Sequence, residues 1–126
     1  MNRLLFISLF FLLIGCSNPT KQTQLSVYEA DFKTIFQVAI SSLKDRRFVI
    51  KNYDWNSGEI DAYLIYGSNS QKKEVVANVS LEQSGTKVKV RITVKKSETS
   101  SPISTSDLRS IEKDLFDSID EAILKK

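Results

Sequence analysis

The chain has 126 residues, a formal charge of +3, one cysteine and no histidine. This length suits one compact domain, and the charge excess is too small to predict a nucleic-acid partner. The lack of histidine excludes Ser-His-Asp and Cys-His catalysis and histidine zinc sites, and a single cysteine excludes an internal disulfide. We therefore expect no metal, no cofactor and no enzyme activity, although carboxylate-based hydrolysis and Ser-Lys chemistry remain open.

The N-terminal segment is an apolar run over residues 4–14, preceded by the cation Arg3. The run has 11 residues, whereas a helix needs about 20 to cross a bilayer. A core helix would carry polar residues at helical spacing, and only Ser8 interrupts this run. A cation followed by a short apolar stretch is instead typical of a cleaved secretory signal peptide.

The run ends at Leu13-Ile14-Gly15-Cys16, which resembles the bacterial lipobox. The resemblance implies that the Cys16 thiol receives a diacylglyceryl group, that residues 1–15 are removed, and that acyl chains such as palmitate anchor the protein. Two or three such chains hold a protein on a bilayer almost without release. Because Ser17 follows where inner-membrane retention usually uses Asp, we expect a lipoprotein of the outer membrane, facing the periplasm or the cell surface.

Cleavage before Cys16 would leave 111 of the 126 residues, with 17 basic and 15 acidic side chains. We assign residues 16–24 to the lipidated cysteine and a polar, flexible tether that contains one proline. Residues 25–126 form a single predicted domain. Its first segment, residues 25–29, fits a short strand, which leaves the number of strands open between four and five.

Two helices are predicted in this domain. Asp31 is a good N-cap for the first, and Ser104 with Asp107 forms a box-like cap for the second. Both helices carry their apolar side chains at the spacing of one continuous stripe, which predicts a face packed on the core. The stripes are Phe32, Ile35, Phe36, Ala39, Ile40 and Leu43 in the first helix, and Leu108, Ile111, Leu115, Ile119, Ala122 and Ile123 in the second.

The residues between the helices alternate with period two and predict strands over 48–54, 59–66, 74–83 and 87–96. Ser84-Gly85 fits a two-residue hairpin loop, which would set Leu81 opposite Val88 and Glu82 opposite Lys87. The predicted fold class is α+β, with two layers: an antiparallel sheet of four or five strands and two helices on one face.

The order of elements resembles small helix-on-sheet domains of uncharacterised bacterial envelope lipoproteins. More loosely, it resembles the helix-grip domains of the C lipoprotein of the outer-membrane barrel-assembly machinery. The shared pattern is a Leu-x-x-x-x-Phe-x-Ile run over residues 43–50, followed by a Gly58-Glu59-Ile60 strand start. The resemblance implies a non-catalytic interaction or assembly module whose partners are the membrane, through Cys16, and an envelope protein.

The strand alternation also predicts a contact face on the side of the sheet away from the helices. Aromatic and basic side chains there suit an envelope protein or, as the alternative function, anionic glycan or lipid headgroups. The same side chains equally fit the solvated side of an edge strand, and Trp55 fits a hairpin anchor. The residues of this predicted face are Tyr53, Trp55, Tyr63, Lys87, Lys89 and Arg91.

One carboxylate pair lies on the same predicted face. Glu59 and Asp61 are two residues apart on one strand, a spacing loosely compatible with acid–base work on a glycosidic bond. The simpler interpretation is that these two residues are ordinary surface carboxylates of a strand, which face lysines on neighbouring strands.

Overall fold

The computed structural model of the protein describes residues 7–9 and 21–124. Most of the described chain belongs to a single sheet and two helices. In chain order the elements are β1 (Ile7–Leu9), β2 (Lys21–Tyr28), α1 (Phe32–Asp45), β3 (Val49–Asp54), β4 (Glu59–Gly67), β5 (Lys72–Ser84), β6 (Lys87–Lys96) and α2 (Thr105–Leu124).

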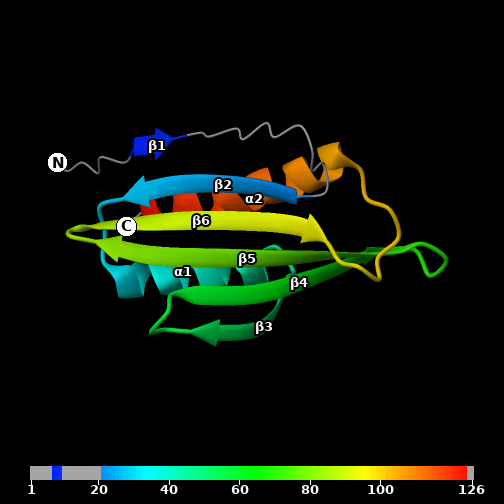
Figure 1. The fold of residues 1–126 in the computed structure, drawn as a ribbon, viewed down its shortest axis with the longest axis horizontal. Helices are drawn as coiled ribbons and strands as arrows, with labels where there is room; N and C mark the ends of the chain where they lie inside the picture. Colours follow the sequence, from blue (N-terminus) through cyan, green and yellow to red (C-terminus); the bar gives the residue numbers. More distant parts are fainter. Residues whose placement is uncertain (1–6, 10–20, 125–126) are drawn as a thin grey trace.

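The strands form one antiparallel sheet in the order β1-β2-β6-β5-β4-β3. Helix α2 packs against β2 and β6, helix α1 packs against β3 and β5, and the two helices touch each other. Figure 1 shows both helices on the same side of the sheet. The predicted two-layer α+β fold with two helices on one face is therefore confirmed.

The N-terminal edge of the sheet differs from the prediction in extent. Strand β2 begins at Lys21 and ends at Tyr28, so it starts four residues before the predicted strand and takes in residues 21–24 of the predicted tether. The short strand β1 adds to the edge of β2 and comes from the predicted leader. Without residues 1–15, the sheet would have five strands with β2 at its edge.

Both predicted helix starts are confirmed. The Asp31 side chain accepts a hydrogen bond from the backbone N–H of Thr34 at 3.2 Å, and the hydroxyl of Ser104 accepts one from the N–H of Asp107 at 3.1 Å. These bonds satisfy donors that a helix leaves unpaired in its first turn. Neither helix combines the length and hydrophobicity of a membrane span.

The core lies between the helices and the inner face of the sheet, as the apolar stripes predict. Its helical part includes Ile35, Phe36, Ala39 and Leu43 from α1, and Leu108, Leu115, Ile119 and Ile123 from α2. Its strand part alternates with exposed or half-buried residues and includes Tyr28, Ile60, Ala62, Val75, Ala77, Val79, Leu81, Val88, Val90, Ile92 and Val94.

The predicted register of the β5–β6 hairpin is wrong. Leu81 pairs with Val90 instead of Val88, and Glu82 pairs with Lys89 instead of Lys87. The loop residues are Gly85 and Thr86, and Gly85 takes a φ of +64°, as the first loop position of a type II′ turn requires. A slip of two residues keeps every side chain on its own face, so the burial pattern could not reveal the difference.

Gly58, in the β3–β4 turn, has the closest contacts of the described glycines. Its φ is +75°, and a Cβ atom there would collide with the carbonyl oxygen of Leu81. The Gly58 carbonyl in turn accepts a hydrogen bond from the N–H of Leu81 at 2.8 Å. Only glycine allows this approach, which joins the β3–β4 turn to β5.

Candidate functional site

The basic part of the predicted contact face lies on the outer face of β6. Lys87 and Arg91 are exposed and Lys89 is half-buried, and all three alternate with buried valine and isoleucine. However, β6 lies between β2 and β5. The interpretation of these cations as the solvated side of an edge strand is therefore wrong, because β6 is an interior strand of the sheet.

A β-bulge in β3 changes the direction of the aromatic residues that follow it. Before the bulge, Val49 pairs with Tyr63 and Ile50 with Ala62. The register then shifts between Ile50 and Asn52, so Tyr53 pairs with Ile60, which is fully buried on the helix side. An extra residue in one strand moves every later side chain to the opposite face. The prediction that Tyr53 lies on the outer face is therefore wrong.

Tyr53 and Trp55 both pack against Phe36, a buried core residue of α1. The Trp55 ring stacks on the Phe36 ring with centroids 4.2 Å apart, and the Tyr53 ring meets it edge-on at 6.2 Å. Both side chains keep solvent-facing surface, with 52% of Tyr53 and 40% of Trp55 exposed. Trp55 is thus a hairpin anchor, as the sequence indicates, and it is not on the outer face of the sheet.

Tyr63 stays on the outer face but away from the cations predicted to accompany it. Its neighbours across the sheet are Val49 on β3 and Val76 on β5. Val76 in turn pairs with Lys95 of β6, which lies four residues beyond Arg91. The six predicted residues therefore occupy three separate places: the β6 cations, Tyr63, and the aromatic pair against α1.

The carboxylates of Glu59 and Asp61 share one amide donor. The Asn78 side-chain nitrogen donates to Asp61 Oδ1 at 2.7 Å and to Glu59 Oε1 at 3.1 Å. The Ser80 hydroxyl donates to Glu59 Oε2 at 2.8 Å. These bonds link β4 to β5 on the outer face, and no cluster of metal-ligating side chains occurs in the described residues. This arrangement favours a cross-strand polar network.

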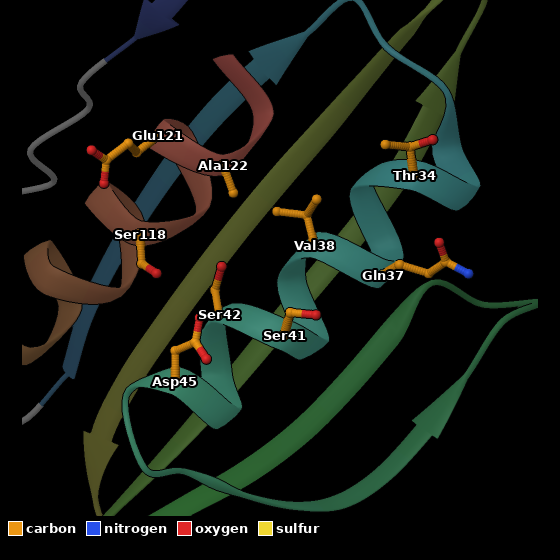
Figure 2. A pocket seen from close by; sticks show the side chains of 9 residues that line it. All are labelled: Thr34, Gln37, Val38, Ser41, Ser42, Asp45, Ser118, Glu121 and Ala122. Carbon is orange, nitrogen blue, oxygen red and sulfur yellow. The ribbon is translucent and has the colours of Figure 1, made fainter. Parts of the chain in front are cut away.

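A groove of about 430 Å³ runs between α1 and α2. Figure 2 shows Val38 and Ala122 directed toward one another across it, with hydroxyl groups placed along its sides. Its nine lining residues include the carboxylates Asp45 and Glu121 but no cation. A site of this composition offers hydroxyl and carboxylate contacts along the seam between two packed helices.

A second hollow of about 410 Å³ lies beside Trp55 at the end of the β3–β4 hairpin. Aromatic Phe32 forms another wall, and the polar residues Asn56, Glu82 and Gln83 complete it. Apolar rings beside amide and carboxylate groups are suited to a polar ligand with an apolar face.

Three polar side chains between α2 and the sheet, Glu112, Tyr28 and Asp120, were not predicted from the sequence. Burial raises the pKa of Glu112 to about 7, while Arg109 opposes the rise and Asp117 adds to it. The Glu112 Oε2 atom is buried without a hydrogen-bond partner in the described chain. The Tyr28 hydroxyl donates to Asp120 at 3.0 Å, and burial followed by Asp120 raises the pKa of Tyr28. Glu112 lies four residues after Leu108 on the apolar stripe of α2, so its spacing in the sequence predicts a side chain that faces the core.

No protein-family model matches the sequence, and no curated protein matches it. Among solved structures, the chain is similar to Ara h 8.0201 with a TM-score of 0.62 and 11% identity, over 84% of this chain and 98% of that chain. The protein TTHA0849 from Thermus thermophilus is similar with a TM-score of 0.42 and 9% identity, over 81% and 98% of the respective chains. At 11% identity the first likeness extends to the fold alone.

Proposed function

We propose that this chain is a bacterial lipoprotein, anchored to the outer membrane through Cys16, whose domain is a non-catalytic interaction or assembly module of the cell envelope. The observation that carries the proposal is the Leu13-Ile14-Gly15-Cys16 sequence at the end of a short apolar run. The position of the domain supports it, because β2 begins at Lys21, five residues after the cysteine. A domain that follows the acylated residue so closely would be held at the bilayer surface.

The anchor is tested by replacing the acylated residue. Wild-type protein should incorporate labelled palmitate and fractionate with the outer membrane, and Cys16→Ala should lose the label and change its fractionation. Ser17→Asp is a matched control, since it keeps the acylated thiol and is expected to move the labelled protein to the inner membrane. A wild type without label, or a Cys16→Ala protein with unchanged membrane fractionation, would refute the proposal.

A second candidate function is the binding of an anionic glycan or lipid headgroup through the outer face of β6. The position of Lys89 and Arg91 on an interior strand, on the face opposite the helices, favours it. Binding through such cations should weaken as added salt screens exposed charges, whereas docking of a protein on apolar surface should not. The double variant Lys89→Glu, Arg91→Glu should abolish the first kind of binding and leave folding intact.

A further inference from the structure

Four lysines gather at one end of the sheet. Lys72 and Lys73 open β5, and Lys95 and Lys96 close β6. The strand register brings them together, because Lys95 and Lys96 pair with Val76 and Val75, three and two residues beyond Lys73. We call these four residues the lysine end. Figure 1 shows it on the right, where the β4–β5 turn and the β6–α2 connection also lie.

The side-chain charges of the lysine end are accessible to a binding partner. Lys72 and Lys95 are exposed, and Lys73 and Lys96 are half-buried. Lys73 Nζ lies 5.9 Å from the centre of the Tyr66 ring, and Lys96 Nζ donates to the carbonyl of Ser97 at 3.2 Å. The salt bridge found in the described part of the chain joins two α2 residues, Lys113 and Asp117, so it involves none of the four. Their nearby acids along the chain are Glu74 and Glu98.

The lysine end is also the end of the sheet nearest to Cys16 along the chain. Strand β2 begins there, because Lys21 is the register partner of Lys95. Five residue steps separate Cys16 from Lys21, and an extended chain covers at most about 18 Å in that number of steps. The opposite end of the sheet, at the β5–β6 turn, is roughly 40 Å away, since β5 is 13 residues long.

The outer face beside the lysine end adds apolar surface. Ile65, two residues before the end of β4, is 47% exposed, and Val49 is 50% exposed next to Tyr63. Cations combined with exposed aliphatic and aromatic side chains are the composition of proteins that lie on a membrane surface.

We propose that the lysine end is a docking surface for the anionic phospholipid headgroups of the membrane that holds the Cys16 lipid. This inference rests on the proposed lipid anchor, which would keep the four lysines within reach of the headgroups at a high effective concentration. Basic residues attract an anionic leaflet only within about one Debye length. The short chain from Cys16 to β2 allows this end to come that close to the headgroups. A domain docked by this end keeps the β5–β6 turn outside that distance, because β5 is 13 residues long.

The test uses the lipidated protein in vesicles that contain phosphatidylglycerol and a headgroup nitroxide quencher. Because Cys16 is acylated, one added thiol can be labelled selectively with bimane. Ser70→Cys places the probe in the exposed β4–β5 turn beside the lysine end, and Thr86→Cys places it in the exposed β5–β6 turn. The bimane at position 70 should be quenched and the bimane at position 86 should not.

Charge variants then test whether the quenching depends on the four lysines. Changing Lys72, Lys73, Lys95 and Lys96 to Gln should abolish quenching at position 70 while the protein stays on the vesicles. The matched control removes an equal charge outside both the lysine end and the outer face of β6, through Gln at the exposed residues Lys33, Lys44, Lys51 and Lys113, and should leave the quenching unchanged. Vesicles of phosphatidylcholine alone should reproduce the loss seen with the first variant.

The lipid anchor and the docking surface are tested by separate measurements. The docking surface is refuted if the protein is anchored but the probe at position 70 is not quenched. It is also refuted if that probe is quenched equally in both charge variants and in vesicles without anionic lipid. Neither result contradicts the lipid anchor. The intact mass of the same sample reports acylation. A Cys16 without acyl groups overturns the proposed function, and this inference with it.

Discussion

The two ends of the sheet are built on different physical principles. At the end that holds the β3–β4 and β5–β6 turns, here called the hairpin end, the Trp55 ring stacks on Phe36 of α1 and the Tyr53 ring meets Phe36 edge-on. Gly58 also brings the β3–β4 turn against β5 there. At the lysine end, strand termini carry four cations beside long polar connections. Packing therefore closes one end of the two-layer fold, and charge is concentrated at the other end, where exposed cations are expected to contribute little to folding. Stability and contact with a partner should therefore be separable by mutation.

The largest expected effect is at Gly58, where a Cβ atom would lie closer to the backbone than at the other described glycines. Gly58→Ala should lower the free energy of unfolding by about 3 kcal/mol, because the new methyl group meets the Leu81 carbonyl and an L-residue is strained at positive φ. Gly85→Ala is the matched control, with positive φ but open space around it, and should cost about 1 kcal/mol. Urea denaturation measures both. Equal losses would show that the contact with Leu81 contributes nothing.

The next effect concerns Glu112 in α2, the helix that begins near the lysine end. Its pKa is about 7 in the folded protein against 4.5 for the free side chain. The folded carboxyl therefore keeps a proton that the unfolded chain releases, and stability should fall as the pH rises from 4.5 to about 7. The full loss is about 3 kcal/mol, at 1.36 kcal/mol for each pKa unit.

Glu112→Gln removes this titration and should be more stable than the wild type above about pH 7.5, with a much smaller difference near pH 4.5. Unfolding in urea at several pH values measures the difference. A wild type and a variant whose stabilities run parallel across this range would show that Glu112 ionises in the folded protein without penalty.

Trp55 gives an intermediate effect at the hairpin end. Trp55→Ala should lower the free energy of unfolding by about 2 kcal/mol, less than the 3–5 kcal/mol of a fully buried aromatic, because 40% of the side chain is exposed. Tyr63→Ala on the outer face is the comparison and should cost less than about 1 kcal/mol. A Trp55 variant as stable as the wild type would contradict the role of the Phe36 stack in closing this end.

The smallest effect is expected at the lysine end. Replacing Lys72, Lys73, Lys95 and Lys96 with Gln should change the free energy of unfolding by less than about 1 kcal/mol, because two of the lysines are exposed, two are half-buried, and none is in the core. Thermal denaturation in low and high salt measures it. A large loss of stability would mean that these lysines belong to the packed structure after all, and the contrast between the two ends would disappear.

The sequence predicted the features that depend on local chemistry and periodicity. The caps at Asp31 and Ser104, the helical stripes and the alternating inner face of the sheet all follow from side-chain spacing. The β5–β6 register did not, because a slip of two residues preserves that alternation. The prediction of the contact face was wrong at β3, because no glycine or proline in the sequence marks the register shift between Ile50 and Asn52. The lysine end itself follows from a hairpin between β5 and β6, whereas the start of β2 beside it depends on the strand order, which the sequence did not predict.

The central claim, a lipid anchor on Cys16, is tested most directly by the intact mass and N-terminal peptide of the protein purified from membranes. We expect a chain of 111 residues that begins at Cys16 and carries a diacylglyceryl group, with or without a further acyl group on its amino terminus. The matching N-terminal peptide should yield no residue from positions 1–15. A chain that begins at Met1, or one that begins at Cys16 with an unmodified thiol, would contradict the account.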